Sequence, residues 1–296
     1  MNAPAIQVRD LRVAFGKSVV LDGLDLTVER GEVFALLGPN GAGKTTTINI
    51  LTTLGTSDTG TVEVFGIDVA RNPIAVKQRI SLTGQAVAVD DVLTATENLV
   101  MLGRLSGLSG REARARAAEL LERFDLTDAA AKRVGTYSGG MRRRLDLALS
   151  FVVTPEILFL DEPTTGLDTR SRRELWDVIR SLADAGTTVF LTTQYLEEAD
   201  QLADRIAVLD AGRIVGLGTP AELKSRVDGD TVELHDEHGA LLREVPTDGT
   251  VSGLRRALDV LDESGAEGVV TLRRPSLDDV FLSLTSAPAA SLQESA

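Results

Sequence analysis

Residues 38–45 read Gly38-Pro39-Asn40-Gly41-Ala42-Gly43-Lys44-Thr45 and match the pattern G-x-x-x-x-G-K-[ST], in which a glycine-rich loop surrounds phosphate groups. The loop follows the apolar run from Val33 to Leu37 and precedes a helix-like run that ends near Leu54. Its backbone N–H groups can point at phosphate oxygens, and the N-terminus of the following helix adds positive potential. We expect Lys44 to bridge the β- and γ-phosphates of a nucleotide and the Thr45 hydroxyl to bind Mg²⁺.

An acidic pair forms the second part of the predicted site. The apolar residues Ile157 to Leu160 are followed directly by Asp161 and Glu162. This run predicts a buried strand that ends in Asp161, and α/β sheets bind their ligands at the carboxyl ends of strands. We expect Asp161 to support Mg²⁺ through a water molecule, and Glu162 to activate or position the water that attacks the γ-phosphate. No Asn-Lys-x-Asp occurs in the sequence, so the usual guanine-reading element of GTPases is missing.

The pattern of apolar residues predicts an α/β fold. The runs 33–37, 157–160 and 188–191 are almost wholly apolar, as expected for strands of a parallel sheet with helices on both faces. Residues 6–13 and 24–28 alternate apolar and polar side chains, which predicts half-buried strands of an antiparallel β subdomain.

Helical patterns lie between the predicted strands at residues 33–37 and 157–160. Residues 94–134 look helical throughout, and Thr94-Ala-Thr-Glu97 and Ser109-Gly-Arg-Glu112 fit the capping-box pattern. We therefore expect a helical insertion over about residues 86–150 of a nucleotide-binding domain that spans residues 1–220.

The composition changes after residue 220. Short strands are expected over 231–234, 241–245 and 269–272, and helices over 251–261 and 276–284, which together predict a small α+β module over residues 221–285. Residues 286–296 are small and polar, and we expect a disordered tail there.

Composition and charge exclude several classes of protein. The chain of 296 residues has no cysteine, which excludes disulfides and thiolate metal sites. Its start lacks the features of a signal peptide, and its apolar runs are far shorter than the roughly 20 residues needed to span a bilayer. The net charge of −13 argues against a nucleic-acid partner. For the basic run Arg142-Arg143-Arg144, a solvated helix face is favoured over a binding patch.

A third motif brings in a family resemblance. Tyr137-Ser138-Gly139-Gly140-Met141 resembles the L-S-G-G-Q signature of ABC ATPases, and the resemblance covers roughly residues 6–218 in the family's order. Ser138 looks like a helix N-cap, and the two glycines leave bare amides at a second anion-binding helix start. In this family the signature of one subunit covers the γ-phosphate held by the other. The resemblance therefore implies a homodimer that encloses two ATP molecules.

Further positions match this family one by one. Phe15 matches the aromatic residue that stacks on adenine, although a core phenylalanine is nearly as consistent with the sequence. Gln85 matches the glutamine that touches Mg²⁺ and couples to the permease, and Asp168 lies in the loop that contacts the opposite subunit. Gln194 departs from the family, which normally has a histidine here that contacts the γ-phosphate. We expect slower hydrolysis with little dependence on a titrating imidazole.

The resemblance also indicates a branch and a function. Residues 194–208 and 275–282 are similar to the daunorubicin-resistance branch, which exports antibiotics and other hydrophobic compounds. This implies an ATP-hydrolysing subunit that uses ATP and Mg²⁺, works on the cytoplasmic side of the cell membrane and contacts it only through a separate permease. A non-transport ABC ATPase of DNA repair or of the ribosome is the alternative, and a P-loop kinase conflicts with the signature.

The motifs and the resemblance give one set of candidate site residues. They are, for catalysis, Glu162, Gln194 and Lys44; for nucleotide binding, Phe15, Gly38, Pro39, Asn40, Gly41, Ala42, Gly43, Lys44, Thr45 and Thr46; for the ATP of the other subunit, Ser138, Gly139 and Gly140; for the dimer contact, Asp168; and for the metal, Thr45, Gln85 and Asp161.

Overall fold

A computed structural model of the chain describes residues 3–84, 89–227, 229–263, 265 and 267–285. The chain divides into two compact units, residues 1–217 and 218–296, and each is described by itself.

A six-stranded sheet forms the centre of the first unit, with the strand order β10-β9-β3-β8-β7-β6. Parallel pairing joins β6 to β7, β7 to β8, β8 to β3 and β3 to β9. The five residues of β3 and of β7 are all buried, which explains why both strands read as continuous apolar runs. The strands are β3 (Val33–Leu37), β6 (Ile80–Thr83), β7 (Ile157–Asp161), β8 (Thr188–Thr193), β9 (Arg205–Asp210) and β10 (Arg213–Gly218).

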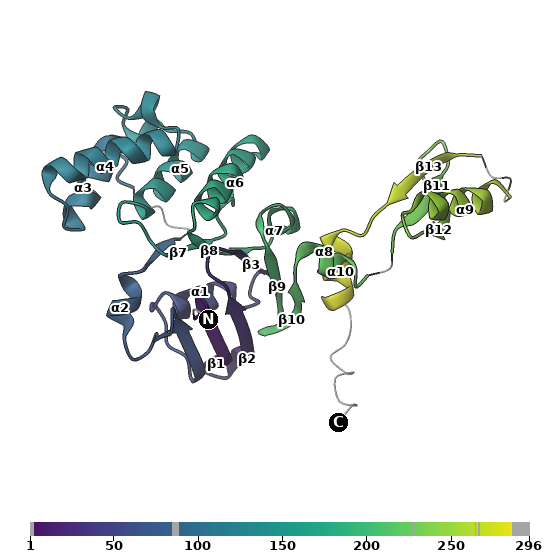
Figure 1. Ribbon diagram of the computed structural model, residues 1–296, viewed down its shortest axis with the longest axis horizontal. Coiled ribbons are helices and arrows are strands. Elements are labelled where there is room, and N and C mark those ends of the chain that lie inside the picture. The colour runs from purple at the N-terminus through teal and green to yellow at the C-terminus, as the bar shows by residue number, and fades with distance from the viewer. Residues whose placement is uncertain (1–2, 85–88, 228, 264, 266, 286–296) are drawn as a thin grey trace. The chain divides into compact units, whose positions relative to one another are not determined.

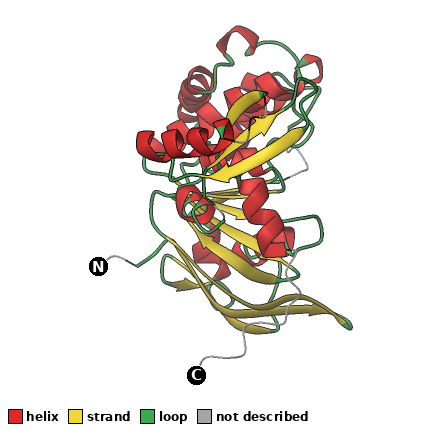
Figure 2. Cartoon of the chain, turned by 90° about the vertical axis from the view of Figure 1, so that its right-hand side faces the viewer, coloured by secondary structure: helices red, strands yellow, loops and turns green. Residues whose placement is uncertain are grey.

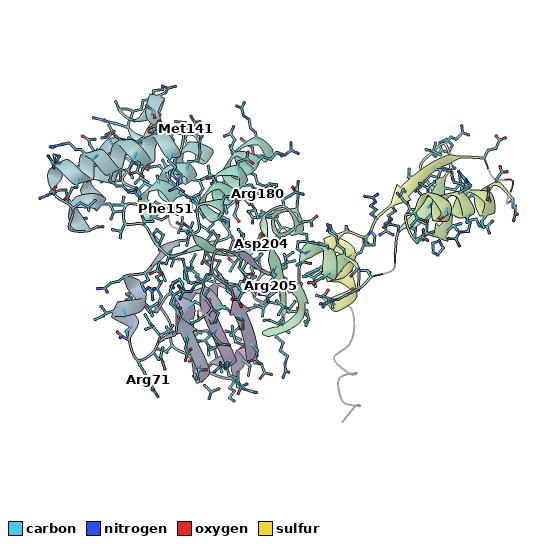
Figure 3. The ribbon with its side chains drawn as sticks, viewed as in Figure 1. Arg71, Met141, Phe151, Arg180, Asp204 and Arg205 are labelled. Carbon is cyan, nitrogen blue, oxygen red and sulfur yellow. The ribbon has the colours of Figure 1, made fainter. Side chains whose placement is uncertain are left out.

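Polar side chains at the start of β9 connect that strand to its neighbours, and Figure 3 labels both of them. The Asp204 carboxylate accepts a hydrogen bond from the Val33 amide of β3 at 2.8 Å, and Arg205 donates to the Thr27 carbonyl of the antiparallel sheet at 3.2 Å. The Asp204 contact aligns with β3 a strand that sequence patterns alone did not predict.

A second, antiparallel sheet of the first unit has the order β2-β1-β4-β5. Its strands are β1 (Ile6–Phe15), β2 (Ser18–Val28), β4 (Thr59–Val64) and β5 (Ile67–Asp68). The two long strands, at the bottom of Figure 2, extend the two predicted strands into one hairpin. The alternation of apolar residues breaks at Asp10, where the register shifts between Val8 and Leu11 and the φ angle is +44°. This break is a β-bulge.

Helix α1 (Lys44–Leu51) lies between the two sheets (Figure 1). Its Ile48, Ile50 and Leu51 belong to one core that also contains apolar side chains of β1, β2, β3, β7 and β8. In the parallel sheet, the ring of Phe190 lies 5.6 Å from that of Phe34 and 5.6 Å from that of Phe159, measured between centroids. The phosphate-binding loop is therefore anchored on a rigid layer.

The helical part contains α3 (Ala95–Leu105), α4 (Gly110–Arg123) and α5 (Gly139–Ser150). Both predicted capping boxes are present, at Thr94 with Glu97 and at Ser109 with Glu112. The helical pattern predicted over residues 94–134 holds for these two capped helices, which pack against each other, but it does not continue beyond Arg123. Only short 3-10 turns follow, over Thr127–Ala129 and Val134–Thr136. The remaining helices of this unit are α2 (Pro73–Lys77), α6 (Thr169–Asp184) and α7 (Leu196–Leu202).

The second unit contains an antiparallel sheet of order β12-β11-β13 and a small core. Ala257 and Leu261 of α9 pack on Val232 and Leu234 of β11. Helices α8 and α10 contact each other. The elements lie where the sequence predicts an α+β module, and they are α8 (Pro220–Lys224), β11 (Thr231–His235), β12 (Leu241–Pro246), α9 (Val251–Asp262), β13 (Val269–Arg273) and α10 (Leu277–Thr285). In the part of the chain that the structure describes, no helix is long and apolar enough to cross a membrane.

Candidate functional site

Close packing explains Gly38 and Gly43 of the loop at residues 38–45. A Cβ atom on Gly38 would lie 2.4 Å from the Leu209 carbonyl oxygen. On Gly43, the N-cap of α1 with a φ angle of +109°, a Cβ atom would lie 2.6 Å from Cδ2 of Leu21. Any other side chain at these positions would push the loop away from the sheets and misplace the start of α1.

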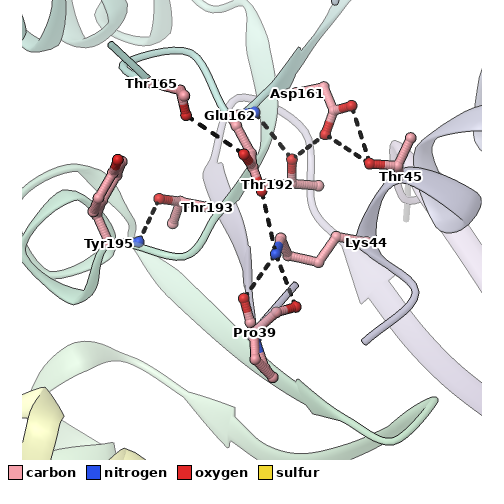
Figure 4. Close-up of polar contacts among 10 residues, drawn as sticks. Pro39, Lys44, Thr45, Asp161, Glu162, Thr165, Thr192, Thr193 and Tyr195 are labelled. Atoms are coloured by element: carbon pink, nitrogen blue, oxygen red, sulfur yellow. Dashed lines mark hydrogen bonds and ion pairs between the residues drawn. The ribbon is translucent and has the colours of Figure 1, made fainter. Parts of the chain in front are cut away.

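Lys44 places a cation at the mouth of this loop. Its Nζ donates hydrogen bonds to the carbonyl oxygens of Gly38 at 2.7 Å and of Pro39 at 3.1 Å, and it lies 3.3 Å from Oε1 of Glu162 (Figure 4). The side chain is only 4% exposed. The ammonium group, the loop amides and the N-terminus of α1 together favour an anion at this position.

Asp161 lies at the carboxyl end of β7 and faces two hydroxyl groups. The Thr192 hydroxyl donates to its Oδ1 at 2.6 Å, and the Thr45 hydroxyl donates to its Oδ2 at 3.2 Å (Figure 4). The Thr45 hydroxyl and the Asp161 carboxylate offer the oxygen ligands that Mg²⁺ prefers. No group of three or more His, Cys, Asp or Glu side chains that could hold a metal occurs among the described residues.

Glu162 occupies a strained turn directly after β7. Its φ angle is +48°, in the left-handed region that non-glycine residues avoid. The conformation is held by its amide, which donates to the Thr192 carbonyl at 3.1 Å and to the Thr192 hydroxyl at 3.2 Å. The Thr165 hydroxyl donates to its Oε2 at 3.4 Å. The carboxylate is thereby directed toward Lys44.

Thr192 is a site residue that the sequence analysis missed. Its fully buried hydroxyl group accepts a hydrogen bond from the amide of Glu162 and donates one to Asp161, so a single atom orients both acidic residues. The only signal in the sequence was a polar residue at the carboxyl end of an apolar strand next to that of Asp161.

Lys44, Thr45 and Glu162 line one pocket of about 380 Å³. Phe15 lines it and is 65% exposed, so the alternative of a core phenylalanine is wrong. The lining residues are Phe15, Val20, Asn40, Gly41, Gly43, Lys44, Thr45, Thr46 and Glu162. The polar groups of the loop and the aromatic ring of Phe15, which both line the pocket, suit a ligand with an anionic part and a flat, less polar part.

The residues of the third motif form a separate surface at the start of α5. The Ser138 hydroxyl accepts a hydrogen bond from the Met141 amide at 3.2 Å and caps the helix, as predicted. Met141 is labelled in Figure 3. A Cβ atom on Gly140 would lie 2.7 Å from the Ser171 hydroxyl on α6, so Gly140 also permits close packing of α5 on α6. Ser138 and Gly139 are exposed, and neither of them lines the pocket.

Asp168 caps α6. Its carboxylate accepts a hydrogen bond from the Ser171 amide at 2.7 Å, and this contact lowers the pKa of Asp168. Gln194 directly follows β8 and is half-buried. Gln85 lies outside the described residues.

The prediction of a solvated face for Arg142, Arg143 and Arg144 was wrong. Arg143 is only 8% exposed and contacts Asp146 at 3.0 Å. Its neighbours also have partners, with Arg142 at 3.0 Å from Asp91 and Arg144 at 2.9 Å from Asp125. An aspartate three residues after an arginine on a helix is the signal that could have revealed this burial.

Comparison with known proteins agrees with this geometry. Residues 21–165 match the family described as ABC transporter. The daunorubicin resistance ATP-binding protein DrrA3 of Streptomyces coeruleorubidus is 53% identical, with 96% of this chain and 97% of that protein covered. The chain belongs to the ABC transporter ATP-binding proteins.

Two further likenesses support the assignment of this ABC ATP-binding chain. The daunorubicin/doxorubicin resistance ATP-binding protein DrrA of Streptomyces peucetius is 51% identical, with 96% of this chain and 93% of that protein covered. A solved ATP-binding subunit of an ABC transporter is 27% identical and has a TM-score of 0.66, with coverage of 75% of this chain and 92% of that chain. The predicted family, branch and α/β fold are confirmed, and so is an ATP-hydrolysing subunit of an ABC transporter; nothing supports the alternative in DNA repair or on the ribosome.

Proposed function

We propose that this ABC chain hydrolyses MgATP in the pocket between its phosphate-binding loop and Glu162, and that two copies enclose two ATP molecules. One observation carries the proposal. Lys44 lies within 3.3 Å of Glu162, and Thr45 lies within 3.2 Å of Asp161, so a phosphate-binding cation, a base and a metal-binding pair meet in one place. This set of groups suits phosphoryl transfer to water.

In the proposed reaction, Lys44 and the loop amides orient the phosphates and stabilise the charge that develops on them. Glu162 orients the attacking water and accepts its proton. Thr192 keeps the Glu162 turn and the Asp161 carboxylate in place during this step. A magnesium ion held by Thr45, by Asp161 and, as the family resemblance implies, by Gln85 would supply further positive charge. Phe15 would stack on the adenine ring.

The second copy would complete each site. Ser138, Gly139 and Gly140 of one chain would cover the γ-phosphate bound by the other, and Asp168 would contact the opposite chain. The exposure of Ser138 and Gly139 at the capped start of α5 supports this assignment, because free amides at a helix N-terminus attract anions. Gln194 would face the γ-phosphate as a neutral hydrogen-bond donor.

We also propose the role of this activity in the cell. The relatives named above are daunorubicin and daunorubicin/doxorubicin resistance ATP-binding proteins. By analogy, this chain would power export of a hydrophobic drug or antibiotic through a separate membrane permease, from the cytoplasmic face of the cell membrane.

Steady-state ATP turnover of the wild-type chain and of Glu162→Gln tests the chemistry. We expect the variant to lose at least about 100-fold in kcat, because the proton acceptor is removed. Its Kd for a fluorescent ATP analogue should stay unchanged, because the amide keeps the shape of the side chain. Equal turnover of the two proteins would contradict the assignment of Glu162. Export is tested by drug efflux from cells that express the chain with its permease, where Glu162→Gln should abolish efflux.

A further inference from the structure

Arg143 connects the helix that follows the signature to two other segments of the site. It lies on α5, inside the first unit, and is 8% exposed. Its Nε donates to the Pro163 carbonyl oxygen at 2.9 Å, and its Nη1 donates to the Gly84 carbonyl oxygen at 2.9 Å. One planar guanidinium group thereby holds two backbone segments at fixed distances from α5.

The two carbonyl groups lie next to Glu162 and at the end of β6. Pro163 directly follows Glu162, so its carbonyl belongs to the strained turn that carries the proposed base. Gly84 directly follows β6, the strand that pairs with β7. Thr192 holds the turn from the side of the sheet, through the amide of Glu162. Arg143 holds it from the side of α5, so the turn is fixed at both ends.

The guanidinium group of Arg143 is buried among acidic side chains. Asp146, one helical turn further along α5, is 5% exposed and accepts a hydrogen bond from Nη1 at 3.0 Å. Burial lowers the pKa of Arg143, and the negative charges of Asp146, Glu198 and Asp161 oppose that shift. Nη2 has no hydrogen-bond partner among the described residues. Burying this ion pair costs desolvation free energy, and an apolar pair of similar size would often give a fold of equal stability. The buried guanidinium therefore points to a role in positioning rather than in stability.

The neighbouring arginines do not share this position. Arg142 contacts Asp91 and Arg144 contacts Asp125, two residues whose side chains are 54% and 93% exposed. Each contact therefore lies toward solvent rather than toward the turn after Glu162.

We propose that Arg143 is a positioning residue for ATP hydrolysis. It couples the position of α5 to that of the turn that holds Glu162. The start of α5 carries Ser138, Gly139 and Gly140, so a shift of this helix when the two copies close would reach the base through the Pro163 carbonyl. The inference rests on the proposed function, because it assumes that Glu162 acts on water. It adds a residue that acts through the base and does not touch the nucleotide.

The test compares three variants of the full-length chain with wild type, by kcat, by Kd for a fluorescent ATP analogue and by melting temperature. Arg143→Lys keeps the charge but cannot reach both carbonyls. The double variant Arg143→Met with Asp146→Leu replaces the buried ion pair with apolar side chains of similar size. Arg205→Lys is the matched control, because Arg205 at the start of β9 also donates to a backbone carbonyl, that of Thr27 at 3.2 Å, on β2 rather than beside α5.

We expect both Arg143 variants to lose roughly 10- to 100-fold in kcat, since small misplacements of a reacting group have effects of this size. Their Kd for the analogue should equal that of wild type. The double variant should melt close to wild type while its kcat stays low, which a merely structural role would not produce. Arg205→Lys should melt lower with an unchanged kcat.

Two results would overturn the inference. If Arg143→Lys turned over ATP like wild type, or if kcat recovered together with melting temperature in the double variant, Arg143 would be structural only. Failure of the wild-type chain to hydrolyse ATP would overturn the proposed function, and the inference with it. The first case leaves wild-type turnover intact, so the two failures are distinguishable.

Discussion

At the residue scale, Thr192 illustrates how one hydroxyl group can organise a catalytic site. It donates to Asp161 at 2.6 Å and accepts from the Glu162 amide at 3.2 Å, and its side chain is fully buried. Glu162 has a positive φ angle, so its backbone would relax if this contact were lost.

We predict that Thr192→Val, which keeps the shape of the side chain, lowers kcat by roughly 10- to 100-fold, since a hydrogen bond to a charged group contributes about 1.5–3 kcal/mol. Thr52→Val is the control, because the Thr52 hydroxyl is also buried but donates to backbone carbonyls of α1, those of Ile48 at 2.8 Å and Asn49 at 3.4 Å. Steady-state turnover of both variants checks this. Equal kcat values for Thr192→Val and Thr52→Val would rule out the role assigned to Thr192.

Gln194 gives the second prediction at this scale. A glutamine can donate to a phosphate but cannot become a cation near neutral pH, whereas histidine titrates at about pH 6.5. We expect Gln194→His to raise kcat and to introduce a dependence of kcat on pH near that value. Turnover measured between about pH 5.5 and 8.5 checks this. An unchanged rate with an unchanged pH profile would show that the substitution has no catalytic consequence.

At the element scale, the two capping boxes of the helical part link helix stability to pH. Hydrogen bonds from Thr94 lower the pKa of Glu97, and hydrogen bonds from Ser109 lower the pKa of Glu112. A glutamate in the unfolded chain has a pKa of about 4.3. If its pKa is lower in the folded state, it stabilises the folded protein at pH values above that unfolded-state pKa. That stabilisation is lost as the pH falls through the folded-state pKa.

We therefore predict that the double variant Glu97→Gln with Glu112→Gln loses less stability than wild type when the pH falls from about 6 to 3. Glutamine can still occupy the capping box but does not titrate. The denaturant midpoint measured at several pH values checks this. Parallel curves for the two proteins would mean that neither glutamate contributes to the acid sensitivity.

How far the sequence predicts such elements depends on what holds them. Capping boxes and the glycine-rich loop are local patterns, so α3, α4 and the start of α1 could be placed from the sequence. Strands β9 and β10 could not, because they depend on pairing with distant strands and on contacts such as that of Asp204 with Val33. The hairpin β1–β2 was seen only in part, because the bulge at Asp10 interrupts the alternation of apolar residues.

The same distinction applies to the site. Lys44, Asp161 and Glu162 were predicted together because each belongs to a motif that is continuous in sequence, and the structure brings them into contact. Thr192 and Arg143 act through residues some 20 to 60 positions away, so only the folded chain shows their contacts. Because Arg143 is buried, the prediction that its basic run forms a solvated face was wrong.

At the scale of the whole molecule, the two units have separate cores. The core around α1 contains no side chain beyond residue 217 among the described residues, and the small core of Val232, Leu234, Ala257 and Leu261 is confined to the second unit. We therefore propose a nucleotide-binding domain over residues 1–220, with its helical insertion at about 86–150, and an accessory module over residues 221–285.

This division predicts that a chain ending at Pro220 folds and binds ATP. Its Kd for a fluorescent ATP analogue should match that of the full-length chain, because every residue that lines the pocket lies before residue 218. Circular dichroism and analogue titration check this. An unfolded or non-binding fragment would show that the second unit is required to complete the first.

We propose that ATP holds two copies together until Glu162 acts. The mass of Glu162→Gln in solution, measured with and without MgATP by light scattering during gel filtration, tests this proposal. With the base removed and the shape kept, we expect a shift from monomer to dimer, or a tighter dimer, that appears only when MgATP is present. A protein that binds MgATP, as shown by the fluorescent analogue, and yet keeps the same mass and compactness would contradict it.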